Sequence, residues 1–204
     1  MARDGIVYVM VPGILAVLAL LLGYWPIAIP LVILTAFMAY FFRDPSRQLP
    51  TDPNVVVSPA DGRVTRVQQV ESGSESSPTL VSIFLSPFDV HINRAPIAGQ
   101  ITNVTYMKGK FLIATNEDAS LVNEQNSLTI EGEKITVVCK QIAGILARRI
   151  VCWKRAGEQV ALGERFGLIK FSSRTDLVLP ASVTVSVKPG DRVKGGSSII
   201  GRIQ

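Results

Sequence analysis

The sequence predicts a mainly β protein in which a β-rich domain follows an N-terminal α-helical membrane hairpin. Residues 5–42 carry no charged side chain, a run of 38 positions. After this run, short segments rich in Val, Ile and Thr recur between Gly, Pro, Asn and Asp residues, without a sustained 3.6-residue period. We therefore expect a membrane-anchoring hairpin at residues 1–47 and a β-rich domain at residues 48–204.

The apolar run is too long for a single membrane-spanning helix. As one helix, residues 5–42 would extend about 57 Å, nearly twice the hydrocarbon core of a bilayer. The tetrapeptide Gly-Tyr-Trp-Pro at residues 23–26 predicts a turn, and its two aromatic side chains favour the membrane interface. A turn there leaves residues 5–23 and 26–42 as two helices, each just long enough to cross.

Basic residues flank the predicted hairpin at both ends. Arg3 precedes the first helix, and Arg43 and Arg47 follow the second. The preference of basic residues for the cytoplasmic side therefore predicts a cell-membrane protein whose globular domain is cytoplasmic. A re-entrant hairpin that dips into one leaflet is the alternative, because Pro12 and Pro30 weaken regular helix.

Seven short runs predict strands in the second domain. Each combines β-branched residues with flanking turn residues. The runs are residues 54–58, 80–85, 100–106, 127–130, 135–141, 149–153 and 182–187.

Two pairs of similar segments within the chain narrow the choice of fold further. Residues 59–64 (PADGRV) resemble residues 96–101 (PIAGQI), and each is a tight glycine turn that enters a strand. Residues 157–163 and 190–196 share the pattern Gly-x-x-Val-x-x-Gly, in which glycine relieves the steric cost of a positive φ. These turns resemble those of lipoyl- and biotinyl-carrier-like β-sandwiches (barrel-sandwich domains), whose pseudo-symmetric halves interlock.

Charge and cysteine usage restrict the partners. The chain has 21 Lys+Arg against 16 Asp+Glu, a net charge of +5. This excess suits an anionic membrane surface or an anionic substrate, and it is too small and dispersed to indicate nucleic acid. Cys139 and Cys152 have neither metal-ligand spacing nor a disulfide pattern, so we expect buried thiols in a reduced compartment. With one histidine, no metal cofactor is expected.

His91 and Asp61 are the first candidates for chemistry. His91 is the only histidine, so acid–base catalysis by a histidine at neutral pH must use it. Asp61 lies in the first glycine turn, where aspartate is common for local hydrogen bonding. A single histidine is also more often structural than catalytic, so the residues alone leave both interpretations open.

Four motifs now match a known family. They are Phe-Arg-Asp-Pro at residues 42–45, Ser-Pro-Ala-Asp-Gly at 58–62, Leu-Ser-Pro-Phe-Asp-Val-His-Ile-Asn-Arg-Ala-Pro at 85–96 and Phe-Gly-Leu-Ile-Lys-Phe at 166–171. In this order, after a membrane hairpin, the chain resembles the short, archaeal-type phosphatidylserine decarboxylases, which include archaetidylserine decarboxylases. The resemblance implies a self-processing proenzyme that forms a covalent pyruvoyl group. That group converts the serine head group of a diacyl or ether phospholipid to ethanolamine and CO2.

The resemblance also implies which serine becomes the cofactor. The family's motif continues Phe-Gly-Ser-Arg and is cleaved between Gly and Ser, which places the pyruvoyl precursor at Ser173. Cleavage would give a membrane-bound chain, 1–172, and a small chain, 173–204. The pyruvoyl carbonyl would then form a Schiff base with the amine of the substrate.

Four further residues are assigned by the same resemblance. Asp61 and His91 are expected to be the acid–base pair that assists Ser173. Arg94 lies near the place where longer members carry a second histidine, and we expect Arg94 and Arg174 to contact the substrate. The enzyme's partners would be an anionic phospholipid, the membrane and a second copy of the chain in a homodimer.

The chain departs from the family at Ser172, where the family has glycine. A glycine accepts backbone conformations that a residue with a Cβ does not, so Ser172 is expected to slow or block cleavage. The Gly-Ser pair at Gly196 and Ser197 is a competing cleavage site, but cutting there would release only eight residues. We therefore retain cleavage between Ser172 and Ser173.

The alternative function is that of a non-catalytic protein. A membrane-anchored adaptor or carrier with a lipoyl-like domain would share the predicted fold. Adaptors of that sort insert a helical hairpin between the sandwich halves, and residues 64–157 show no heptad pattern. A carrier would need a modifiable lysine at a hairpin tip, which Lys108 imitates only weakly.

Overall fold

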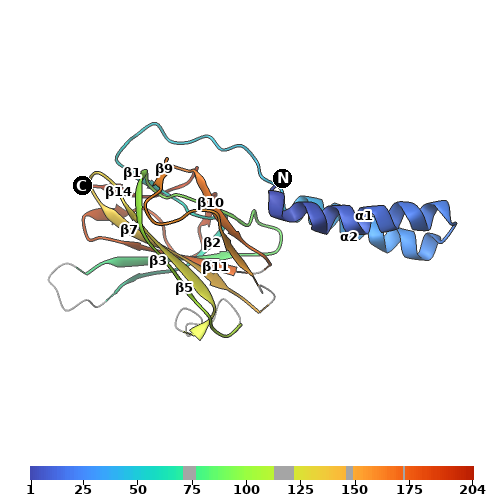
Figure 1. Cartoon of the computed structure of the whole chain (residues 1–204). Coiled ribbons are helices and arrows are strands. Elements are labelled where there is room, and N and C mark those ends of the chain that lie inside the picture. Colours follow the sequence, from blue (N-terminus) through green and yellow to red (C-terminus); the bar gives the residue numbers. More distant parts are fainter. Residues whose placement is uncertain (71–76, 113–121, 146–148, 172) are drawn as a thin grey trace. The chain divides into compact units, whose positions relative to one another are not determined.

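The structure, a computed structural model, describes residues 1–70, 77–112, 122–145, 149–171 and 173–204. These residues form two compact units, Met1–Ser46 and Arg47–Gln204. Figure 1 shows a helical hairpin in the first unit and strands throughout the second. The predicted fold class, a mainly β domain that follows an N-terminal helical hairpin, is confirmed.

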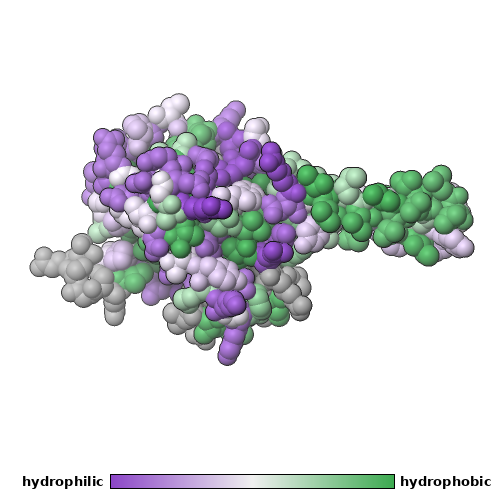
Figure 2. Space-filling model, in the orientation of Figure 1, coloured by the Kyte–Doolittle hydropathy of each residue, from purple (hydrophilic) through white to green (hydrophobic). Residues whose placement is uncertain are grey.

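The first unit consists of a short 3₁₀ turn, η1 (Arg3–Gly5), and two helices, α1 (Ile6–Leu21) and α2 (Trp25–Phe41). The chain reverses at Gly23, whose φ of 75° glycine adopts without strain. The segment Arg3–Leu21 is long and apolar enough to cross a membrane, and α2 is a shorter apolar helix. The exposed side chains of both helices are mostly large and hydrophobic, as the green surface in Figure 2 shows.

The second unit is built from fourteen strands in the part of the chain that the structure describes. They are β1 (Val55–Val57), β2 (Gly62–Gln69), β3 (Thr79–Leu85), β4 (Ile92–Arg94), β5 (Gly99–Met107), β6 (Gln125–Glu131), β7 (Thr136–Ala143), β8 (Ile150–Cys152), β9 (Gln159–Val160), β10 (Arg165–Ile169), β11 (Ser173–Leu179), β12 (Val183–Val185), β13 (Arg192–Val193) and β14 (Ile199–Ile203). All seven predicted runs overlap one of these strands.

The strands form one large sheet and two small ones. The large sheet has eight strands in the order β13-β2-β3-β11-β7-β6-β5-β9, and the small sheets have the orders β1-β14-β12 and β4-β10-β8. β11 therefore lies inside the large sheet, antiparallel to β3 on one side and to β7 on the other. Its alternate side chains Leu177 and Leu179 join Ile83 and Leu85 of β3 in the main core.

The similar segments at residues 59–64 and 96–101 exchange equivalent hydrogen bonds in the structure. The Val57 N–H donates to the Pro96 carbonyl over 2.9 Å, and the Arg94 N–H donates to the Pro59 carbonyl over the same distance. β2 and β5 then begin at equivalent glycines of the two segments. The two halves predicted from the sequence therefore interlock.

The second pair of similar segments, residues 157–163 and 190–196, supplies the outer strands of both halves. Each Gly-x-x-Val-x-x-Gly segment contains a two-residue strand, β9 or β13, which pairs with the start of β5 or β2 respectively. Gly157, Gly163, Gly190 and Gly196 all have positive φ, as the pattern predicts. An ideal Cβ on Gly163 would lie 3.6 Å from the Gly196 Cα, so the two turns pack directly on each other.

The start of β11 does not follow from local propensity. The polar residues 171–176 by themselves indicate an interruption before a strand-like stretch at residues 177–180, whereas β11 begins at Ser173. The polar side chains of β11 are buried beside partners from distant parts of the chain, and local propensity does not register such partners.

Gly62→Ala should destabilise the protein strongly. Gly62 has a φ of 151°, and a Cβ there would overlap the Phe84 carbonyl. We expect a loss of about 3 kcal/mol, because backbone strain and this overlap add together. Gly157→Ala is the matched control: its φ is 93°, but a Cβ would meet nothing within 4 Å, so strain alone should cost about 1 kcal/mol. Guanidinium unfolding of the detergent-solubilised chain measures both, and equal losses would contradict this account.

Candidate active site

Ser173 occupies the first position of β11, inside the large sheet. Its register partners are Leu85 of β3 and Ala143 of β7. The residue is 0 % exposed, and its Oγ has no hydrogen-bond partner among the described residues. Burying a hydroxyl without a partner costs about 1–3 kcal/mol, and native structures leave few such groups. Ser173 is therefore a candidate reactive group.

The backbone just before Ser173 adopts a costly conformation. Phe171 has a φ of 62° and is the one non-glycine residue with a positive φ in the described ranges. This left-handed conformation costs a residue with a Cβ roughly 1–2 kcal/mol. Strain was predicted at Ser172, which lies outside the described residues. The structure places a left-handed residue one position earlier.

His91 is held beside the segment that leads to Ser173. Its backbone carbonyl accepts a hydrogen bond from the Ile169 N–H over 3.3 Å, at the end of β10. The imidazole is buried, and its Nδ1 lies 3.0 Å from the Asp89 carbonyl oxygen. Because a carbonyl only accepts hydrogen bonds, Nδ1 carries the proton. Nε2 is then the basic nitrogen of the neutral ring.

Asp61 is fixed by two donors. Its carboxylate accepts hydrogen bonds from Arg47 Nη2 over 2.7 and 2.9 Å and from the Gly195 N–H over 2.8 Å. Burial raises the pKa of Asp61, and the nearby negative charge of Asp89 adds to the rise, although the Gly195 N–H and the Arg47 guanidinium act in the opposite direction. The Asp61 turn and the His91 turn are neighbours, because Asp89 pairs with Arg192 over 3.2 Å and the strand of Arg192 pairs with residues 62–63.

A chain of buried amides joins the His91 and Ser173 strands. Asn93, two residues after His91, donates from Nδ2 to Thr175 Oγ1 over 2.9 Å. Gln141 of β7 donates to Asn93 Oδ1 over 2.9 Å and accepts from Asn126 of β6 over 3.0 Å. Because Thr175 lies two residues after Ser173, this network fixes the position of β4 relative to β11.

The two arginines that are predicted to contact the substrate form hydrogen bonds or ion pairs within the protein. Arg174 is buried and forms an ion pair with Asp176, with Nε 2.9 Å from Oδ1 and Nη2 3.0 Å from Oδ2. Arg94 is also buried, and its Nη1 donates to the Gly163 carbonyl over 3.1 Å. The structure thus gives both arginines intramolecular partners, and their contact with substrate stays a prediction.

Sequence reasoning missed several residues of this region. Arg47 was placed in the anchor, yet it belongs to the second unit and binds Asp61. Asn93, Gln141 and Thr175 gave no signal of their own, because Asn93 is 48 positions from Gln141 and 82 positions from Thr175 along the chain. The run of four polar residues at the start of β11, Ser173–Asp176, was the available hint, since a polar residue in a buried strand needs a partner.

Comparison with known proteins adds the family. The family model for phosphatidylserine decarboxylase matches residues 34–201. The chain belongs to the phosphatidylserine decarboxylase family. It is 53 % identical over 175 residues to a phosphatidylserine decarboxylase proenzyme of Solibacter usitatus, covering 86 % of this chain and 83 % of the relative. A relative of the same name from Symbiobacterium thermophilum is 47 % identical, with 99 % and 95 % coverage. One from Carboxydothermus hydrogenoformans is 43 % identical, with 100 % and 97 % coverage.

The predicted family is confirmed over almost the whole chain, and it is a family of enzymes. This assignment decides against the non-catalytic adaptor or carrier that the fold alone allowed. The matched residues include every candidate discussed above, from Arg47 to Ser173. The chain is therefore a decarboxylase-family protein in which a buried serine, a buried histidine and a partly buried carboxylate lie on adjoining elements of one β unit.

Arg47→Leu should destabilise this decarboxylase-family protein in a pH-dependent way. The change leaves the Asp61 carboxylate without its cation, which should cost about 1–3 kcal/mol at pH 7.5. The pKa of Asp61 is already raised, and removal of Arg47 raises it further. The carboxyl group therefore protonates more readily as pH falls, and the loss should shrink at pH 4.5. Guanidinium unfolding at the two pH values measures this.

Arg202→Leu is the control for that experiment. Arg202 pairs with Asp52 over 2.6 Å, but both side chains are exposed. Its stability should be close to that of the unaltered protein at both pH values. Equal losses in the two variants, or a loss for Arg47→Leu that grows on acidification, would refute the account of Asp61.

Thr175→Val should weaken the amide network. It removes the acceptor of the Asn93 amide and leaves a buried N–H unsatisfied, which should cost about 1–3 kcal/mol. Thr65→Val is the control, because Thr65 is exposed and its hydrogen bond to the Ser82 carbonyl is 3.3 Å long. It should change stability by less than about 0.5 kcal/mol. Thermal unfolding of the two variants compares them, and similar melting temperatures would show that the network is not needed.

Proposed function

We propose that this protein decarboxylates the serine head group of phosphatidylserine to give phosphatidylethanolamine and CO2, after Ser173 has been converted to a pyruvoyl group. The name that these relatives share, phosphatidylserine decarboxylase proenzyme, supports both the reaction and a processing step. The observation that carries the assignment of Ser173 is its buried Oγ without a hydrogen-bond partner among the described residues. That oxygen is the nucleophile of the proposed processing reaction.

Self-processing needs only Ser173, its neighbour and water. Ser173 Oγ attacks the carbonyl carbon of residue 172 as its proton leaves, and the amide nitrogen departs with a proton, so an ester replaces the peptide bond. Loss of the Ser173 Cα proton then expels the carboxylate of residue 172 and leaves a Cα=Cβ double bond. Addition of water releases ammonia and gives the pyruvoyl group. The left-handed residue Phe171 favours the first step, because relief of backbone strain lowers its cost.

We assign His91 the role of general base toward the Ser173 hydroxyl. The hydrogen bond from Nδ1 to the Asp89 carbonyl leaves Nε2 as the basic nitrogen. Burial raises the pKa of Asp61. A carboxyl group with a raised pKa exchanges protons closer to neutral pH, as acid–base catalysis requires. The Arg47 and Gly195 donors fix the direction of that carboxyl group. Asp61 and His91 therefore make the proposed acid–base pair.

The pyruvoyl group, once formed, supplies the electron-accepting carbonyl that decarboxylation requires. The chain's own residues position that group. Ser173 is the first residue of a strand with register partners on both sides, from Ser173 to Val178. The small chain, 173–204, would thus stay bound to chain 1–172 after cleavage. Burial at the start of β11 also excludes bulk water from the reacting position.

The anchor suits a substrate that resides in a bilayer. The apolar segment Arg3–Leu21 is long enough to cross, and the predicted second crossing would use α2. We propose attachment to the cell membrane with the β unit on the cytoplasmic side, because Arg3 and Arg43 flank the hairpin. Arg94 and Arg174 are retained as proposed contributors to the substrate site, through their positive charge.

Intact-mass analysis of the purified protein tests the proposed cleavage. Ser172→Gly should raise the rate of conversion to fragments 1–172 and 173–204 at least about tenfold, because about 1.4 kcal/mol of barrier corresponds to a tenfold change in rate. Ser173→Ala should give no cleavage and no carbonyl adduct with hydrazine. Ser197→Ala, made together with Ser172→Gly, is the control and should process like Ser172→Gly alone. Cleavage in the Ser173→Ala variant, or its loss when Ser197→Ala is added to Ser172→Gly, would refute the assignment.

A further inference from the structure

The strand register places one row of residues across the large sheet, directly beside Ser173. The row comprises Arg192, Arg63, Phe84, Arg174, Ile142, Gln125 and Met107, one from each of seven neighbouring strands. Beyond it, every strand ends or begins on the same side. The row, Tyr106 next to it in β5, and the described segments beyond it (residues 61–62, 85–91, 108–112, 122–124, 143–145, 149 and 193–195) are called the Ser173 edge below.

Exposed hydrophobic side chains are concentrated at the Ser173 edge. Six of the nine exposed large hydrophobic residues described in the second unit belong to it. They are Phe88, Tyr106, Met107, Phe111, Val122 and Ile145. Phe88 and Ile145 are 66 % and 54 % exposed, and they occupy the turns that follow the two register partners of Ser173. A cluster of this kind marks an interaction surface.

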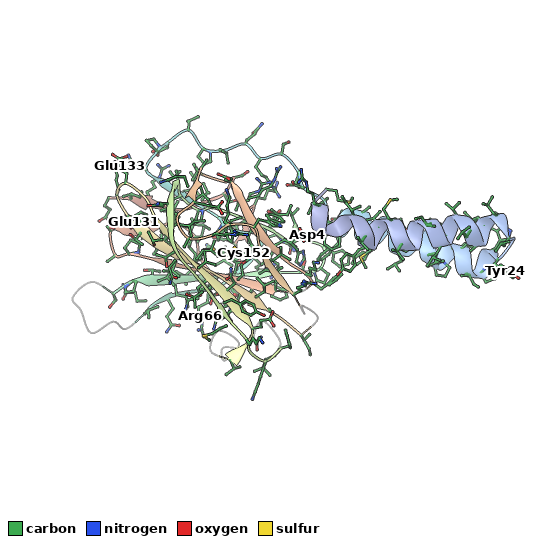
Figure 3. The ribbon with its side chains drawn as sticks, viewed as in Figure 1. Asp4, Tyr24, Arg66, Glu131, Glu133 and Cys152 are labelled. Atoms are coloured by element: carbon green, nitrogen blue, oxygen red, sulfur yellow. The ribbon has the colours of Figure 1, made fainter. Side chains whose placement is uncertain are left out.

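The exposed charges at the Ser173 edge are predominantly positive. Its exposed cations are Arg63, Lys108, Lys110, Arg149, Arg192 and Lys194. The described carboxylates there are engaged: Asp61 with Arg47, Asp89 with Ser86 and Arg192, and Glu124 with the Tyr106 hydroxyl. By contrast, Glu131 is the last residue of β6, at the other end of the strand, and Glu133 follows it, as Figure 3 shows.

We propose that the Ser173 edge docks on the surface of an anionic lipid bilayer, with Phe88 and Ile145 inserted below the head groups. This inference rests on the proposed function, because it names the surface from which the phospholipid head group reaches Ser173. Apolar turns mixed with lysine and arginine match the boundary between head groups and acyl chains. A second copy of the chain fits less well, because a two-fold contact would bring cations of like sign together.

A fluorescent label at single cysteines tests this docking on the full chain in vesicles. Cys152 is first replaced by serine, and Cys139 stays unlabelled because burial raises the pKa of its thiol. The nitrobenzoxadiazole (NBD) label is then attached at Phe88→Cys, Ile145→Cys or Val70→Cys. Val70 is the control: it is exposed and follows β2 at the opposite end of the sheet, about 20 Å from the Ser173 edge.

The labelled proteins are compared in vesicles of phosphatidylglycerol and phosphatidylcholine with and without brominated acyl chains. We expect bromine to reduce NBD emission at positions 88 and 145 at least about twofold and to leave position 70 nearly unchanged. In pure phosphatidylcholine the reduction at 88 and 145 should weaken, since cations no longer meet anionic lipid. Equal quenching at 70 and 88, or none at 88 and 145, would overturn the proposal. So would a blue shift at 88 that depends on protein concentration in detergent, which indicates a second copy.

A second measurement separates this proposal from the proposed function. Quenching needs no catalytic turnover, so it can be recorded on the Ser173→Ala variant, which cannot form a pyruvoyl group. Quenching there together with absent cleavage of the Ser172→Gly variant would support docking and refute the function. Cleavage and decarboxylation without quenching would overturn docking and leave the function intact. Lys108→Gln with Lys110→Gln should lower the quenching at 88 in anionic vesicles, and unchanged quenching would contradict the electrostatic part.

Discussion

The structure of the β unit depends on how the buried strand β11 satisfies its polar groups. Ser173, Arg174, Thr175 and Asp176 follow one another in a strand that lies between two others and is almost wholly inaccessible to water. Each polar atom there must find a partner inside the protein or remain at a cost of free energy. Arg174 and Asp176 pair with each other, and Thr175 joins the amide network through Asn93. Among the described residues, the Ser173 hydroxyl has no hydrogen-bond partner, and this agrees with the reactive role that we propose for it.

The amide network also accounts for the way distant segments reach the site. Asn93, Gln141 and Thr175 come from β4, β7 and β11, and β4 belongs to a different sheet from the other two strands. Hydrogen bonds of 2.9 Å between them fix the small sheet that follows His91 against the strand that begins at Ser173. A fully connected buried network of this kind specifies one arrangement, because any displaced member loses its partners.

The pseudo-two-fold symmetry between the two halves is broken at the candidate site. The turns at residues 59–64 and 96–101 exchange equivalent hydrogen bonds, yet Asp61 in the first corresponds to Ala98 in the second. Only the first turn therefore carries a carboxylate, and Arg47, at the start of the second unit, binds it. The same backbone arrangement thus occurs twice, and the Asp61 carboxylate is present only in the half to which we assign the acid–base pair.

The hairpin, the β-rich class, the glycine turns and the family could all be predicted from the amino-acid sequence. These features depend on local patterns: an uncharged run of 38 residues, β-branched segments between turn residues, glycines at positive φ and contiguous motifs. The family's motifs also indicated Ser173, His91 and Asp61 as candidates. The folded chain was needed to find the start of β11, the partners of Asp61, Arg94 and Arg174, the amide network and the clustering of apolar turns beside Ser173. Those features depend on strand register and on contacts between residues far apart in the chain, which composition and spacing do not encode.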